Sequence, residues 1–341
     1  MRSPSVTDVV CLGESLVTFL PSRPGRLADV PSFTRSIGGA ESNVACALAA
    51  AGHRVRWVSR VGADAFGDHL VAAIAAYGVD TGAVRRDPHR PTGVYFRTAT
   101  DRADQEHEVV YYRAGSAASA MSPETVAYDD LLSARVLHLS GITAALSAGC
   151  LALLRDLTRR RPGRPLVSFD VNHRPALSAD PDVLLELARG ADLVFVGEDE
   201  AEAVWGLRGA AAVREVLPEP RVLVVKRGGA GTVAFSRCGE ETHAPAPRVD
   251  IVAPTGAGDA FAAGFLSATL RGLDMRRRLR HGHLMAAAAL TVAGDLGTPP
   301  STAHADRLVE LDDAAWGRLH LGPGWTGTGA GTGNDQEVRT P

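Results

Sequence analysis

The sequence predicts an α/β protein in which helices cover both faces of a mainly parallel sheet. Short, β-branched apolar runs alternate with alanine- and leucine-rich stretches, and these apolar runs are nearly continuous, as in strands buried on both faces. The length of 341 residues suits one large domain, or one domain with a small appendage. A hydrophobic fraction of 45% with 22% charged residues is ordinary for a globular protein.

Seven apolar runs are strand candidates, and helix candidates are interleaved with them. The strand candidates are 9–12, 56–60, 136–140, 166–170, 193–196, 222–226 and 232–235. The helix candidates are 41–51, 67–77, 148–160, 181–189, 199–205, 259–271 and 275–293. Each helix candidate lies between two strand candidates or follows the last one, which is the order expected when helices connect parallel strands.

Two stretches break this rhythm, at 16–37 and 92–113. The second contains the alternation Val94-Tyr95-Phe96-Arg97, which is typical of a strand with one buried face. We expect antiparallel strands outside the main sheet that form a small β-lid over a cleft, although edge strands without a function would show the same periodicity. The predicted domain spans 8–318. The glycine-rich segment 322–341 has the composition of a disordered tail.

Charge and hydropathy exclude several classes of partner. The net charge of −3 gives no electrostatic case for binding nucleic acid or an anionic membrane. No apolar run approaches 18 residues without a charge, and the N-terminal segment lacks the apolar core of a signal peptide, so no membrane partner is expected. The four cysteines are scattered without C-x-x-C spacing, which predicts reduced, mostly buried thiols and a cytoplasmic protein.

The segment Thr255-Gly256-Ala257-Gly258-Asp259 precedes an apolar helix candidate and is the strongest chemical signal. Glycines let main-chain N–H groups approach an anion, and the first turn of the helix adds free donors and the positive end of its dipole. The negative charge of Asp259 weakens such an anion site, and this cost makes sense if the carboxylate takes a proton from a hydroxyl that attacks a phosphoryl group. A turn in which Asp259 only caps the helix is the alternative.

The common phosphate-binding motifs are absent from the sequence. A P-loop requires Gly-Lys followed by Ser or Thr, whereas the single lysine, Lys226, is followed by Arg227. No G-x-G-x-x-G follows the first strand candidate, which runs into Cys11-Leu12-Gly13-Glu14-Ser15. A nucleotide must therefore be held by other means.

With the segment Gly38-Gly39-Ala40-Glu41-Ser42-Asn43 added, the chain resembles the ribokinase-like sugar kinases of the phosphofructokinase B type, from about residue 9 to residue 310. Within that family it is most similar to the 2-dehydro-3-deoxygluconokinases, on the segments Tyr111-Tyr112-Arg113, His138-Leu139-Ser140-Gly141 and Asp170-Val171-Asn172-His173-Arg174. The resemblance implies a three-layer α/β/α core, a β-lid that takes part in homo-oligomer contacts, ATP as donor and Mg²⁺ as cofactor. The implied acceptor is a primary hydroxyl of 2-dehydro-3-deoxy-D-gluconate.

The resemblance also implies roles for particular residues. Asp259 matches the catalytic base, and Gly256, Ala257 and Gly258 match the backbone cradle for the transferred phosphate. The residues that match the sugar site are Gly38, Gly39, Asn43, Tyr111, Arg113, Arg174 and Asp295. Those that match the nucleotide site are Asn172, Lys226, Gly228, Gly229 and Gly231, together with Gly256 and Gly258, and Glu200 matches the acidic residue associated with Mg²⁺.

An acid sugar carries a carboxylate, which the planar fork of arginine pairs with bidentately. Arg113 and Arg174 are the candidates, and Arg174 follows a strand whose carboxyl end is where α/β sheets bind ligands. Either could be an ordinary surface arginine, because 35 of the 36 basic residues are arginine. Alternation predicts that only one of Tyr111 and Tyr112 faces the cleft.

The chain departs from the family pattern at two positions near the predicted site. Ala253 stands where the family usually has an aspartate that helps to hold a monovalent cation, which predicts weak or absent activation by K⁺. Gly197 stands where an asparagine usually begins the segment of Glu200, which weakens the inferred metal site.

Other functions remain open from the sequence. The same fold could phosphorylate a neutral sugar such as fructose or ribose, or the epimer 2-dehydro-3-deoxygalactonate, and ADP could replace ATP. A lyase acting through a Schiff base on Lys226, and a sugar sensor without catalysis, are rivals from other classes.

Overall fold

The computed structural model describes residues 7–23, 25–98, 109–177 and 180–327. Its main sheet has eight strands in these ranges, in the order β14-β13-β12-β11-β10-β9-β1-β4. The strands are β1 (Thr7–Leu12), β4 (Val55–Val58), β9 (Ala134–Ser140), β10 (Leu166–Asp170), β11 (Leu193–Gly197), β12 (Val222–Lys226), β13 (Thr232–Ser236) and β14 (Glu241–Ala244). Neighbouring strands are parallel from β4 to β12, and β13 is antiparallel to both β12 and β14. The predicted mainly parallel sheet is confirmed.

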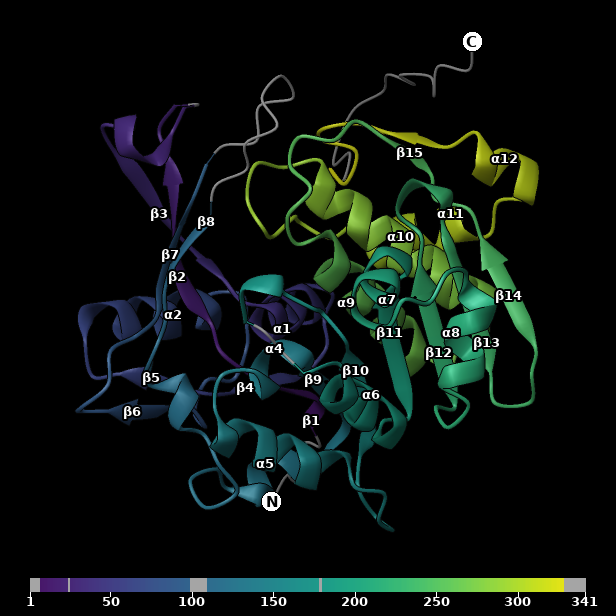
Figure 1. The fold of residues 1–341 in the computed structure, drawn as a ribbon. Helices are drawn as coiled ribbons and strands as arrows, with labels where there is room; N and C mark the ends of the chain where they lie inside the picture. Colours follow the sequence, from purple (N-terminus) through teal and green to yellow (C-terminus); the bar gives the residue numbers. More distant parts are fainter. Residues whose placement is uncertain (1–6, 24, 99–108, 178–179, 328–341) are drawn as a thin grey trace, which may run out of the picture.

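Helices cover both faces of this sheet (Figure 1). One face packs against α1 (Ala40–Ala50), α2 (Ala65–Ala75), α9 (Ala257–Leu270) and α10 (Met275–Leu290), and the other against α5 (Ala148–Thr158), α6 (Pro181–Gly190), α7 (Glu198–Trp205) and α8 (Ala210–Val216). Alternate residues of β1 serve the two faces, since Val9 and Cys11 join one core and Val10 and Leu12 the other. The three-layer α/β/α core is confirmed.

Side-chain caps explain where several helices begin. The hydroxyl of Ser147 accepts a hydrogen bond from the backbone N–H of Cys150 at the start of α5, and the carboxylate of Asp274 accepts one from Arg277 at the start of α10. Asp180 caps α6, whose first residue is a proline that has no N–H to satisfy. Each of these side-chain oxygens satisfies a backbone N–H that the first turn of the helix leaves without a partner.

A separate four-stranded sheet stands apart from the core (Figure 1). It has the order β3-β2-β7-β8, with β2 (Leu16–Pro21), β3 (Phe33–Gly38), β7 (Val94–Arg97) and β8 (Val109–Tyr112). Both predicted stretches contribute to it, and residues 99–108 of the predicted lid lie outside the described residues. The expectation of purely antiparallel strands is wrong, because β2 and β7 pair in parallel across the two antiparallel hairpins. We call this sheet the lid.

The remaining elements are short, and the sequence did not predict them. They are β5 (Arg60–Gly62), β6 (Arg85–Asp87), α3 (Tyr128–Leu132), α4 (Gly141–Ala144), β15 (Arg248–Val249), α11 (Thr302–Val309), α12 (Asp313–Gly317) and β16 (His320–Leu321). A third apolar cluster around Trp316 joins α10 to α11 and α12, and Trp325 of the predicted tail packs against it. Residues 328–341 of that tail lie outside the described residues.

Two further sequence predictions bear on the molecule as a whole. All four cysteines are free, and three of them are buried, as predicted. Among the described helices, none combines the length and the hydropathy needed to cross a bilayer.

Candidate active site

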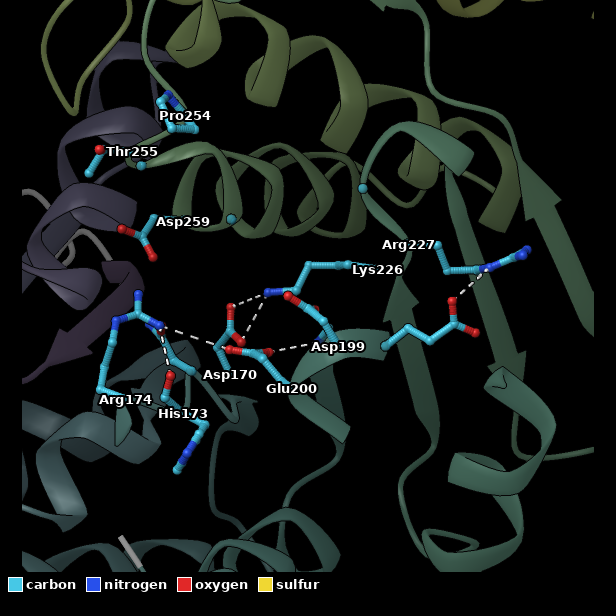
Figure 2. Close-up of a pocket in the computed structure, with 16 residues that line it drawn as sticks. Asp170, His173, Arg174, Asp199, Glu200, Lys226, Arg227, Pro254, Thr255 and Asp259 are labelled. Carbon is cyan, nitrogen blue, oxygen red and sulfur yellow. Dashed lines mark hydrogen bonds and ion pairs between the residues drawn. The ribbon is translucent and has the colours of Figure 1, made fainter. Parts of the chain in front are cut away.

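The carboxyl ends of three neighbouring parallel strands meet at one edge of the main sheet. Asp170 ends β10, Gly197 ends β11 and Lys226 ends β12. The loop before α9 faces this edge, and together they enclose a cleft of about 660 Å³ (Figure 2). Open α/β sheets bind ligands at such an edge, because the loops after the strands leave a crevice there.

The loop before α9 needs its first glycine for steric reasons. Gly256 has a φ of +79°, which disfavours side chains, and a Cβ there would collide with the backbone carbonyl of Asp295. Helix α9 begins directly afterwards at Ala257 and is 14 residues long. Its first turn therefore presents free N–H groups and a positive dipole end beside the cleft, an arrangement that can bind a phosphate.

Asp259 lies in the first turn of α9, partly buried between the loop and the cleft. Its Oδ2 accepts a hydrogen bond of 2.9 Å from the side-chain amide of Asn43 in α1. Burial raises the pKa of Asp259 to about 7, and the nearby charge of Asp170 adds to this, whereas Asn43, Arg174 and Lys226 oppose it. A carboxylate with this pKa can accept a proton near neutral pH.

A second cavity, of about 240 Å³, lies between the loop and the lid. The predicted sugar-site residues all line it: Gly38, Gly39, Asn43, Tyr111, Arg113, Arg174, Asp259 and Asp295. This smaller cavity and the 660 Å³ cleft share the four residues Arg174, Thr255, Gly256 and Asp259. The two spaces therefore meet at the candidate base.

Most of the predicted nucleotide-site residues line the larger cleft. Asn172, Lys226, Gly228, Gly256 and Gly258 do so, whereas Gly229 and Gly231 lie in the same loop after β12 without lining the cleft. Gly231 has a steric role instead, with a φ of +99° and a Cβ position against the backbone of Ala244.

Lys226 and Asp170 form a salt bridge across the strand ends, with distances of 3.0 and 3.1 Å from Nζ to the two carboxylate oxygens (Figure 2). Burial lowers the pKa of Lys226, but the carboxylates of Asp170 and Glu200 outweigh burial and the pKa is raised. The amine is therefore protonated at neutral pH, which is the wrong state for a Schiff base nucleophile.

Asn172 combines two unusual features in the same cleft. Its φ of +45° makes it the one non-glycine residue with a positive φ in the described part of the chain. Its side-chain Nδ2 is buried without a hydrogen-bond partner in the structure. A strained backbone and a buried free donor both cost free energy, and such features are concentrated at ligand sites.

Glu200 lines the larger cleft from the first turn of α7. Its Oε2 accepts a 2.7 Å hydrogen bond from the backbone N–H of Gly197, and burial raises the pKa of its carboxyl group. Within the described ranges, no three His, Cys, Asp or Glu side chains converge into a site that could hold a metal by themselves.

The arginines of the smaller cavity differ in their partners. Arg113 is ion-paired with the buried Glu14, which also accepts a hydrogen bond from Ser116. Arg174 is 47% exposed, and its Nη1 lies 3.0 Å from the carbonyl of His173 and 4.0 Å from Oε1 of Glu200 (Figure 2). Arg174 is therefore the more available of the two predicted partners for a carboxylate.

Among the lining residues of the smaller cavity that sequence reasoning missed are three polar side chains, Glu14, Tyr95 and Arg97. Glu14 follows β1 after Gly13, and Tyr95 and Arg97 lie on the same side of β7 by the alternation of a strand. Of Tyr111 and Tyr112, only Tyr111 lines the cavity, as predicted from alternation.

Comparison with known proteins agrees with this geometry. The family model described as "pfkB family carbohydrate kinase" matches residues 6–302. The chain belongs to the pfkB family of carbohydrate kinases. It is therefore a sugar kinase enzyme, and the lyase and the non-catalytic sensor are set aside, in accord with the protonated Lys226.

Two relatives show the range of named activities. The chain is 33% identical to 2-dehydro-3-deoxygluconokinase of Thermoproteus tenax over 313 residues, which cover 90% of this chain and 95% of the relative. It is 30% identical to fructokinase-1 of Zea mays over 319 residues, which cover 89% of this chain and 97% of the relative.

Solved structures share the fold over nearly their whole length. A PfkB protein from Polaromonas sp. JS666 has a TM-score of 0.77 and 34% identity, covering 88% of this chain and 99% of that one. An Escherichia coli protein assigned as a ribokinase II, in complex with ATP and Mg²⁺, has a TM-score of 0.77 and 25% identity. The match covers 88% of this chain and 98% of that one.

Proposed function

We propose that the protein transfers the γ-phosphoryl group of ATP, with Mg²⁺, to the terminal hydroxyl of an acid sugar, most specifically 2-dehydro-3-deoxy-D-gluconate. One observation carries the proposal. A cleft large enough for a nucleotide and a smaller cavity at the lid share Asp259 and the loop that begins α9. A phosphate bound on that loop would lie between its donor and an acceptor hydroxyl.

The donor side offers residues for each part of a magnesium nucleotide. Asp170 and Glu200 line the cleft, and Mg²⁺ is ordinarily held by one or two carboxylates together with phosphate oxygens and water. The donor set fits that ion, with Glu200 as the proposed ligand and Asp170 beside it. Once bound, the ion would neutralise negative charge on the phosphates. Asn172 would give its free Nδ2 donor to the nucleotide, and Gly228 would let the nucleotide lie against backbone.

The transfer itself needs little covalent work from the protein. The free N–H groups of Gly256, Ala257 and Gly258 hold the γ-phosphoryl oxygens and stabilise the charge that builds up during transfer. The hydroxyl oxygen of the sugar attacks the γ-phosphorus, the bond from phosphorus to the leaving oxygen of ADP breaks, and Asp259 takes the hydroxyl proton. The amide of Asn43 holds the carboxylate of Asp259 in the orientation for this step.

The acceptor side supports an acid sugar through Arg174, whose guanidinium is the least committed in the cavity. The relative from Thermoproteus tenax carries the name of that activity. Fructose is the second candidate, because a fructokinase is 30% identical and because Arg113 already has a carboxylate partner in Glu14. The epimer 2-dehydro-3-deoxygalactonate carries the same carboxylate and belongs in the same test.

An assay of ADP release tests the proposal with Mg-ATP and a panel of acceptors: both 2-dehydro-3-deoxy acids, fructose and ribose. We expect turnover with an acid sugar at a kcat/KM at least about tenfold above fructose, which is the discrimination of one charge-assisted contact. Turnover with neutral sugars alone would reject the acid-sugar substrate. Repeating the best acceptor with ADP as donor tests the choice of nucleotide.

We also propose that the lid pairs with a second copy of the chain. Phe96 stacks on Phe19, with 4.7 Å between the ring centroids, and contacts Phe33 and Tyr112 edge-on. This aromatic cluster occupies the side of the lid opposite Tyr95 and Arg97, and Tyr112 remains 64% exposed. Light scattering of the wild type should give twice the mass of one chain, and light scattering of Tyr112→Asp should give the mass of a single chain. A monomeric wild type would contradict the pairing.

A further inference from the structure

Arg97 reaches from the lid into the core of the site. It ends strand β7, and its side chain is only 5% exposed. Its Nη1 donates a 2.9 Å hydrogen bond to the hydroxyl of Thr255, and its Nη2 lies 2.9 Å from Oδ1 of Asp295. One guanidinium thus joins three segments that are far apart in the sequence.

A second residue of the same lid strand also binds Asp295. Tyr95, two residues earlier in β7, donates a 3.1 Å hydrogen bond to the other carboxylate oxygen of Asp295. Asp295 therefore receives both of its partners from one face of one lid strand. Breaking a buried ion pair of this kind costs free energy of folding because it leaves a buried charge without a partner. The lid and Asp295 are therefore held in fixed positions relative to each other.

Asp295 in turn supports the phosphate-binding loop. Gly256 packs so closely on the backbone of Asp295 that a Cβ would collide with its carbonyl. Thr255, the residue before Gly256, is held by Arg97 directly. The loop is therefore braced on both sides, by Arg97 through Thr255 and by the backbone of Asp295 behind Gly256.

We infer that Arg97 is a positioning residue: from the lid, it sets the geometry with which the loop of Gly256 to Gly258 receives the γ-phosphate. This inference rests on the proposed function for the place of the γ-phosphate. It predicts that Arg97 matters for a nucleoside triphosphate and hardly at all for the diphosphate, because ADP has no group on that loop. Lysine cannot replace Arg97 fully, since a single ammonium lacks the planar fork that reaches Thr255 and Asp295 together.

Calorimetric titration of the full chain with Mg-ADP and with a non-hydrolysable ATP analogue tests this. In Arg97→Gln the affinity for the analogue should fall about tenfold, because the loop no longer holds its N–H groups in place for the γ-phosphate, while the affinity for ADP stays within twofold. The affinity of Arg97→Lys for the analogue should lie between those of wild type and Arg97→Gln. Thr255→Val removes the link to the loop yet leaves the ion pair with Asp295 intact, so it remains informative if Arg97→Gln does not fold, and it should lower analogue affinity selectively as well.

Arg164 provides the matched control. It forms an equally buried pair with Asp192, at 2.9 Å and with 7% and 8% exposure, before strands β10 and β11 at the opposite edge of the sheet. Arg164→Gln should reduce thermal stability, although less than Arg97→Gln because Asp192 keeps Arg160 and Arg221 at 3.6 Å, and it should change neither nucleotide affinity. Unchanged analogue affinity in Arg97→Gln and Thr255→Val, or an equal loss in Arg164→Gln, would overturn the inference. Because no sugar enters this experiment, a failed sugar panel would reject the proposed substrate and leave the brace to be judged separately.

Discussion

The side-chain amide of Asn43 lies 2.9 Å from Oδ2 of Asp259, although 216 residues separate them in the chain. Asn43 belongs to α1 and Asp259 to α9, two helices that pack on the same face of the sheet. The helix that follows Gly38 and Gly39 of the smaller cavity therefore also orients the candidate base. Under the proposed function, this one hydrogen bond would join acceptor binding to proton removal.

Asn43→Ala should move the pH dependence of catalysis. The hydrogen bond from Asn43 favours the ionised form of Asp259 and lowers its pKa, so its loss raises a pKa that is already about 7. The acidic limb of kcat/KM against pH should shift to higher pH, and activity at pH 7 should fall more than activity at pH 9. A profile with an unmoved midpoint would show that Asn43 serves only the sugar.

Asp259 should also limit the stability of the free enzyme. Its pKa in the folded state lies above the ordinary value of 3.8, so the folded state holds the proton more tightly and this stabilisation is lost as pH rises from about 4 to about 7. Asp259→Asn should therefore raise the melting temperature relative to wild type at pH 8 and have little effect near pH 4. Thermal melts at the two pH values measure the difference. Equal effects at both would contradict the raised pKa.

Arg174 and Arg113 should behave differently when replaced. Arg174→Gln removes an exposed guanidinium with a weak partner, so we expect KM for the acid sugar to rise about tenfold or more, with an unchanged melting temperature. Arg113→Gln leaves the buried Glu14 without its ion partner, and we expect a loss of stability as well. Kinetics and melts on both variants separate the roles. A KM effect confined to Arg113→Gln would reverse the assignment.

Potassium should have little effect on turnover. Ala253 is buried just before the loop and offers no carboxylate to a monovalent cation. Replacing K⁺ by tetramethylammonium at constant ionic strength should change kcat by less than twofold. An Ala253→Asp variant provides the comparison, and a steep potassium dependence of the wild type would contradict the prediction.

The parts of the fold that the sequence predicted are those set by hydrophobic pattern. The seven strand candidates all enter the main sheet, because strands buried on both faces, such as the parallel strands at its centre, read as continuous apolar runs. Strand β14 was missed because Glu241, Thr242 and His243 are polar residues of an edge strand. Helices α11 and α12 are short, and tertiary packing around Trp316 stabilises them more than their own periodicity does.

The site was predictable where a local motif carries the chemistry, as in the loop from Gly256 to Asp259. Pairings between distant segments could not be read from the sequence. The ion pair of Arg97 with Asp295 and that of Arg113 with Glu14 depend on how the lid sits over the core. A single chain gives no signal for such contacts, because one arginine among 35 looks like any other.

The central claim is that Asp259 removes the proton from the acceptor hydroxyl, and kcat of Asp259→Asn tests it most directly. Asparagine keeps the size of the side chain but cannot take a proton, and the affinity for a non-hydrolysable ATP analogue serves as the control for an intact site. With the best acceptor of the panel we predict that kcat falls by about 10² to 10⁴-fold while analogue affinity is retained. A variant that turns over within threefold of wild type would contradict this role for Asp259.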